Sequence, residues 1–123
     1  MSAPRSLVFV SLFALVAGCS SSTAPSTGGG GGGGTCSGTN AAVAVCDNKF
    51  SPTGSTITAG SSITWTWKGS NTHNVTFLTG PVVPAASGTM SSGTFTQTFA
   101  TPGAYTYECS IHGAVMSGTI TVN

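Results

Sequence analysis

The sequence predicts an all-β domain over residues 36–123, built as a Greek-key sandwich of two sheets. From Ala41 onward, short segments rich in Val, Ile, Thr and aromatic residues alternate between apolar and polar positions, which is the period of half-buried strands. Turns that contain Gly or Pro separate these segments, and no stretch has the periodicity of an amphipathic helix. Short strands at this spacing are typical of a β-sandwich.

Each alternating segment is predicted to form one strand. In chain order, the predicted strands are Ala42–Cys46, Thr56–Thr58, Ser62–Lys68, Asn74–Leu78, Thr94–Ala100, Ala104–Cys109 and Gly118–Val122. Apolar residues of the third segment share one face and are expected in the core, namely Ile63, Trp65 and Trp67. In the sixth segment Tyr107 and Cys109 share a face, so the cysteine sulfur is directed inward at the end of the strand, and Glu108 points outward.

Charged residues are scarce in this chain, which has three Lys or Arg and two Asp or Glu among 123 residues. This composition provides no basic surface for a nucleic acid. It also leaves no Ser, His and acidic residue at the spacing of a hydrolytic triad. We therefore expect no nucleic-acid partner and no enzymatic activity, and we expect a monomer.

Residues 1–18 have the pattern of a bacterial lipoprotein signal peptide. Arg5 precedes the apolar run Leu7–Ala17, which is too short to span a bilayer, and the run leads into Val-Ala-Gly-Cys at 16–19. This ending resembles a lipobox, in which cleavage precedes the cysteine and its sulfur carries a diacylglycerol. The alternative is an ordinary signal peptide followed by a chance cysteine. We expect an extracytoplasmic protein that is anchored to a bacterial membrane, on the periplasmic side or at the cell surface, through a lipid on Cys19.

Residues 19–35 are expected to form a flexible tether between this anchor and the domain. The segment is rich in Ser and Gly and includes seven consecutive glycines, Gly28–Gly34. Such a composition cannot bury a core and behaves as a flexible coil, with a span of about 20–25 Å at this length. A domain on this tether would stay near the membrane and still be able to turn toward different partners.

Two cysteines at the start of the domain, Cys36 and Cys46, are expected to form a disulfide. Oxidation is favoured outside the cytoplasm, and the bridge would fix the N-terminus of the domain where the tether ends. Its contribution to stability would be about 2 to 3 kcal/mol. The alternative is a second metal site on these two cysteines, for which Asp47 is the one nearby carboxylate.

The segment Tyr107–Met116 concentrates the donor groups of a copper site. Cys109, His112 and Met116 offer a thiolate, an imidazole and a thioether within eight residues, on a strand end and the tight loop that follows it. The second of the two histidines in the chain, His73, begins an alternating segment upstream. Two His, one Cys and a weak axial Met form the ligand set of blue-copper sites.

Three motifs resemble those of the plastocyanin-like cupredoxins, the group of plastocyanin, amicyanin and pseudoazurin. They are His-Asn-Val-x-Phe at 73–77, Tyr-x-Cys-x-x-His at 107–112 and Gly-x-Ile-x-Val at 118–122, and the resemblance covers residues 41–123. It implies a cupredoxin β-sandwich that transfers single electrons through one type 1 copper ion. The ligands that it implies are His73, Cys109, His112 and Met116.

Two details of the resemblance concern the surroundings of the copper ligands. Asn74 resembles the family's Asn that ties the His strand to the Cys loop by hydrogen bonds, a contact that would orient the ligands. In the family the Met usually follows the second His by three or five residues, whereas Met116 follows His112 by four.

Two functions remain open for such a site. One is electron transfer between transient redox partners that dock near His112, where the neighbours are small or apolar: Ile111, Gly113, Ala114 and Val115. The loop 80–84 is expected to extend the same patch. The other function is copper storage or delivery by a metallochaperone, since the same ligands hold Cu(I). Multicopper oxidase chemistry is excluded, because two histidines cannot build a trinuclear centre.

Overall fold

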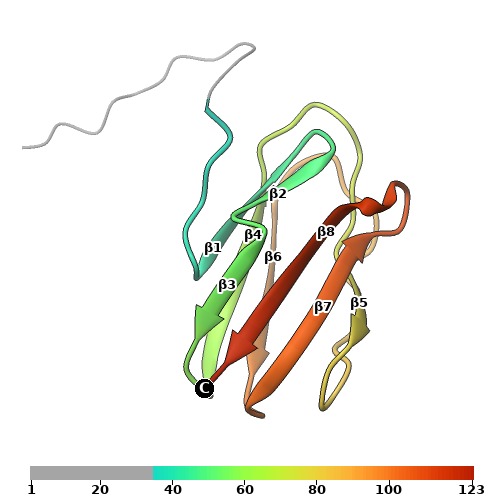
Figure 1. The fold of residues 1–123 in the computed structure, drawn as a ribbon. Helices are drawn as coiled ribbons and strands as arrows, with labels where there is room; N and C mark the ends of the chain where they lie inside the picture. The colour runs from blue at the N-terminus through green and yellow to red at the C-terminus, as the bar shows by residue number, and fades with distance from the viewer. Residues whose placement is uncertain (1–34) are drawn as a thin grey trace, which may run out of the picture. The chain divides into compact units, whose positions relative to one another are not determined.

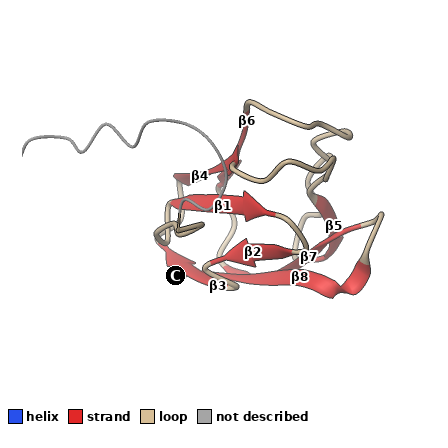
Figure 2. Ribbon diagram, turned by 90° about the horizontal axis from the view of Figure 1, so that it is seen from above, coloured by secondary structure: helices blue, strands red, loops and turns tan. Residues whose placement is uncertain are grey.

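The computed structural model describes residues 35–123, and in this range eight strands form two four-stranded sheets that face each other (Figures 1 and 2). The predicted two-sheet sandwich is therefore confirmed. The predicted signal peptide, the lipidated Cys19 and nearly all of the predicted tether lie outside the described residues. Within residues 35–123, no helix is long and apolar enough to cross a bilayer.

The chain crosses between the two sheets several times, so each sheet contains strands from both halves of the domain. The first has the order β2-β1-β4-β6 and contains β1 (Ala42–Cys46), β2 (Lys49–Ser51), β4 (Ser61–Trp67) and β6 (Thr94–Phe99). The second has the order β3-β8-β7-β5 and contains β3 (Gly54–Ile57), β5 (Thr76–Thr79), β7 (Gly103–Cys109) and β8 (Gly113–Val122). Two pairs are parallel, β1 with β4 and β3 with β8, and the other neighbouring strands are antiparallel.

The core lies between the sheets and follows the predicted alternation. The third predicted segment, which forms β4, buries its apolar face, Ile63, Trp65 and Trp67. The Trp65 ring is fully buried and packs edge-on against Phe77 and Tyr107 of the opposite sheet, with centroid distances of 5.8 and 5.4 Å. Such edge-to-face contacts add to the free energy gained by burying the rings. The aromatic core thus fixes the strand that leads to Cys109.

Three differences from the predicted strands have a clear local reason, and the remaining bounds are shifted by at most two residues. Strand β2 was not predicted, because it has three residues of which only Phe50 is buried, too few to establish an alternation. Strand β5 begins at Thr76 rather than Asn74, since Val75 exchanges hydrogen bonds with Ser87 instead of with a strand of the sheet. Strand β8 begins at Gly113, five residues before its predicted start, because it pairs with β7 through an irregular ladder.

The loop 80–84 does not extend the patch around His112, so that expectation is wrong. Gly80 lies directly against the Tyr105 ring, and Pro81 packs against Gly103 at the start of β7. His112 follows the other end of β7, and Figure 1 shows the loop after β5 at the opposite end of the sandwich from the β7–β8 turn. The residues adjacent to His112 in the sequence remain candidates for the apolar patch around this histidine.

Candidate metal centre

Three predicted ligands converge at one end of the sandwich, where β7 leads into β8. One donor atom each of His73, Cys109 and His112 lies within 4.8 Å of the other two. The Cys109 Sγ atom is 3.8 Å from Nδ1 of His73 and 3.4 Å from Nδ1 of His112. Both imidazoles therefore present the same nitrogen to the sulfur, although the two histidines are 39 positions apart in the chain.

Cys109 is placed by the alternation of β7. Tyr107 and Cys109 are both fully buried, so the sulfur points between the sheets and away from water. Burial also raises the pKa of Tyr107 to about 12, which keeps this neighbouring phenol neutral. Among the described residues Cys109 is the free thiol, because Cys36 and Cys46 are joined in a disulfide.

His112 is placed by the turn that follows Cys109. Its backbone N–H donates to the Cys109 carbonyl oxygen at 3.0 Å, and Gly113 continues the turn with φ of 62°, in the left-handed region that favours glycine. This short connection keeps the His112 ring beside the sulfur, and leaves the ring partly exposed. The neighbours Ile111 and Val115 are exposed apolar residues, with Val115 82% exposed.

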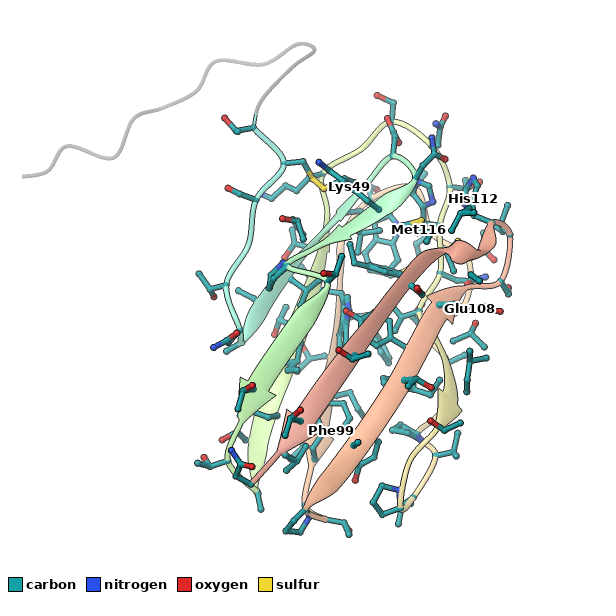
Figure 3. All side chains as sticks on the ribbon, viewed as in Figure 1. Lys49, Phe99, Glu108, His112 and Met116 are labelled. Atoms are coloured by element: carbon teal, nitrogen blue, oxygen red, sulfur yellow. A yellow bond between two sulfur atoms is a disulfide. The ribbon has the colours of Figure 1, made fainter. Side chains whose placement is uncertain are left out.

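Met116 is fully buried, but it lies on β8 and not in the predicted loop. In the ladder between β7 and β8, Glu108 pairs with Ser117 whereas Cys109 pairs with Gly113, so 114–116 form a bulge opposite the end of β7. Figure 3 shows the labelled Met116 and His112 at the same end of the sandwich, with Phe99 toward the other end. The thioether is thus a core group at the end where the three converging ligands meet.

His73 is held by its backbone as well as by its side chain. It forms an isolated antiparallel bridge with Met90, with two N–H···O bonds of 2.9 Å, and its carbonyl accepts the Trp67 indole N–H at 3.3 Å. The Met90 side chain packs against the core, and its main chain also fixes the position of His73.

Asn74 connects the His73 segment to the residue after Cys109. Its Oδ1 accepts the Ser110 N–H at 2.8 Å and its Nδ2 donates to the Ser110 hydroxyl at 2.9 Å. Longer bonds of 3.2 and 3.3 Å join it to Thr76 and Thr89. The Asn74 side chain is buried, so these bonds fix the spacing between the two ligand-bearing segments.

Asp47 also contacts this site, whereas the sequence suggested it only as the carboxylate nearest to Cys36 and Cys46. Its carboxylate accepts N–H bonds from Asn71 at 2.8 Å and Ser70 at 2.9 Å, and lies 3.4 Å from Nε2 of His73. The N–H donors of Asn71 and Ser70 lower the pKa of Asp47, so the carboxylate is charged at neutral pH. An Asp directly after a hairpin strand is a turn signal, but nothing in the sequence indicates a partner 23 to 26 residues away.

The donors of this centre suit copper. A thiolate and two imidazoles, with a thioether in the same core, form the soft set that binds both Cu(I) and Cu(II). A structural zinc site would usually have four strong N or S ligands at one ion. Three clustered donors are one short of that set, which suits blue copper, where the fourth ligand is weak.

Comparisons with known proteins agree with this geometry. Residues 39–123 match the profile of copper-binding proteins of the plastocyanin/azurin family. Two amicyanin variants, one reduced and one oxidized, are 27% and 28% identical to the chain, with TM-scores of 0.60 and 0.59; each match covers 67% of this chain and 80% of amicyanin. A purple cupredoxin from Nitrosopumilus maritimus is 24% identical, with a TM-score of 0.60 and coverage of 68% and 99%, and supports the fold. No curated protein sequence matches the chain significantly.

Proposed function

The chain belongs to the plastocyanin/azurin family of copper-binding proteins, and from this premise we propose that it carries single electrons between extracytoplasmic redox partners while a lipid holds it at a membrane. Cupredoxins are electron-transfer proteins and not enzymes, and the site of His73, Cys109 and His112 supports one copper ion. Met116 would provide the fourth, axial ligand. Copper, when bound there, supplies a reversible one-electron change between Cu(I) and Cu(II).

The observation that carries this proposal is the placement of a buried thiol between two imidazoles that differ in exposure. Cys109 and His73 are 0% exposed, so water is kept from the sulfur and from one side of the site. His112 is partly exposed at the surface of the sandwich. The exposed edge of this ring is therefore the proposed point of electron exchange with a partner protein.

The surface around His112 suits brief encounters. Ile111 and Val115 are exposed apolar side chains on either side of it in the chain. Residues 36–123 contain two Lys, one Asp and one Glu, so their formal charges cancel. A small apolar contact with little electrostatic steering is consistent with weak and transient complexes. Copper storage or delivery receives less support, because the described residues offer one free thiol, which is buried.

A visible spectrum of the copper-loaded protein tests the proposed function. We expect an intense absorption of orange-red light that disappears on reduction, since it arises from charge transfer between the Cys109 sulfur and Cu(II). Cys109→Ser should abolish this band, and Met90→Leu, which changes a thioether outside the ligand set, should retain it. Persistence of the band in Cys109→Ser would exclude this cysteine as the ligand.

Membrane attachment is proposed from the Val-Ala-Gly-Cys motif at 16–19. Cys19→Ser removes the sulfur that would carry the lipid, so labelling with radioactive palmitate and processing before position 19 should both be lost. Copper binding should persist, because the ligands begin more than fifty positions later. Full labelling of the Cys19→Ser protein would place the anchor at another residue.

A further inference from the structure

We propose that Asp47 is a positioning residue of the copper centre, which holds the Nε2 edge of His73 and so presents Nδ1 to the metal. Asp47 lies outside the ligand motifs of the sequence, but its carboxylate contacts the ring of His73.

The two nitrogens of His73 face opposite kinds of group. Nδ1 lies 3.8 Å from the Cys109 sulfur, and Nε2 lies 3.4 Å from Oδ1 of Asp47. A neutral imidazole carries one N–H. If that proton is on Nε2, it can be donated to the carboxylate and the Nδ1 lone pair is free for copper. The other tautomer would point a lone pair at a negative oxygen and place a proton where the metal binds, so the carboxylate favours the productive tautomer.

The carboxylate is fixed in place from the His73 side. Backbone N–H groups of Ser70 and Asn71 both bond to it, and the loop that carries them is in turn anchored to β1, because Lys68 and Gly69 both donate to the Val45 carbonyl oxygen at 2.8 and 3.2 Å. A side chain at position 69 would collide with the Asp47 carboxylate and its backbone nitrogen. Gly69 therefore allows the loop to close around this carboxylate.

The hairpin that carries Asp47 is fixed as well. Asp47 follows Cys46, which ends β1 and is bonded to Cys36. The next residue, Asn48, has φ of 64°, in the left-handed region that Asn tolerates better than most residues and that allows a tight turn into β2. Because both the hairpin and the loop are held, Asp47 can orient a ring that is itself fully buried.

Two effects on copper follow from this contact. Metal-bound histidines commonly donate their second N–H to a carboxylate, and loss of such a partner typically lowers metal affinity about 10- to 100-fold. A negative charge on the far side of the ligand also stabilises Cu(II) more than Cu(I). Asp47 should therefore lower the reduction potential, and its removal should raise it.

The tautomer of His73 can be measured directly in the metal-free full chain. Above pH 8 an ordinary imidazole is neutral, and ¹⁵N NMR of the ring then distinguishes the Nε2–H form from the Nδ1–H form. We expect His73 in the wild-type protein to be the Nε2–H form. A predominant Nδ1–H form would overturn the proposal, whether or not the protein binds copper.

Variants then test whether the carboxylate is responsible. Asp47→Ala should mix the tautomers, weaken Cu(II) binding about 10- to 100-fold and raise the potential. Asp47→Asn, which keeps an acceptor oxygen without the charge, should restore most of the affinity and still raise the potential. Gly69→Ala moves the carboxylate without changing any charge, and should also weaken binding.

Glu108→Gln is the matched control, because it removes an equal charge one residue from Cys109 on the outward side of β7. We expect it to keep the wild-type tautomer and affinity. If Asp47→Ala and Asp47→Asn changed only the stability of the fold, with His73 tautomer, affinity and potential all as in the wild type, Asp47 would be a structural residue and the proposal would be wrong. Equal shifts in reduction potential for Asp47→Asn and Glu108→Gln would likewise contradict the proposal, because Asp47 would then act only through its charge and not by positioning His73.

Discussion

Asn74→Ala should destabilise the domain by an amount that the structure allows us to estimate. The Asn74 side chain makes two short hydrogen bonds with Ser110 and two longer ones with Thr76 and Thr89. A hydrogen bond contributes about 0.5 to 1.5 kcal/mol net, and we count the two longer bonds at less than that. Water can reach Ser110, which is exposed, and will replace part of what is lost. We expect a loss of about 2 kcal/mol in the free energy of unfolding.

Urea unfolding of the metal-free protein measures this loss. A change of that size should move the midpoint by about 1 M urea, since the slope for small domains is about 1 to 3 kcal/mol per M. Asn71→Ala is the control, because Asn71 is exposed and only its backbone N–H bonds to Asp47. Surface changes of this kind usually stay within about 0.5 kcal/mol. If Asn74→Ala were no more destabilising than Asn71→Ala, the bonds to Ser110 would not hold the two ligand segments together.

Two further predictions concern the axial ligand and the disulfide. Met116→Leu should keep the intense visible band and raise the reduction potential, because the loss of a weak donor disfavours Cu(II) more than Cu(I). Voltammetry measures the potential, and an unchanged value would show that another group is the fourth ligand. Replacement of both Cys36 and Cys46 by Ser should lower the free energy of unfolding by about 2 to 3 kcal/mol. Urea unfolding measures this loss, and a midpoint equal to that of the wild type would show that the disulfide adds no stability.

The cluster of His73, Cys109 and His112 could be predicted from the sequence because its chemistry is rare. Two histidines in 123 residues and one cysteine followed by His112 leave few ways to build a metal site, and alternation in the sixth predicted segment already directed the Cys109 sulfur inward. Strand β2 and the role of Asp47 were not accessible. Strand β2 pairs with its chain neighbour β1, but three residues are too few to show an alternation. The contacts of Asp47 are with residues 23 to 26 positions away, and a single carboxylate gives no periodic signal that would indicate them.

The bulge in the β7–β8 ladder explains how the spacing between His112 and Met116 can be four residues. Glu108 pairs with Ser117, and a regular ladder would next pair Cys109 with Met116, on the same inward face of the sheet. The position of Met116 is therefore set from its C-terminal side, by the register of β8. His112 is set from the other side, by its hydrogen bond to the Cys109 carbonyl oxygen. Because Met116 and His112 are anchored separately, a residue more or fewer between them would be expected to change the size of the bulge rather than the place of either side chain. A spacing of four residues is therefore compatible with the proposed role of Met116 as the fourth ligand.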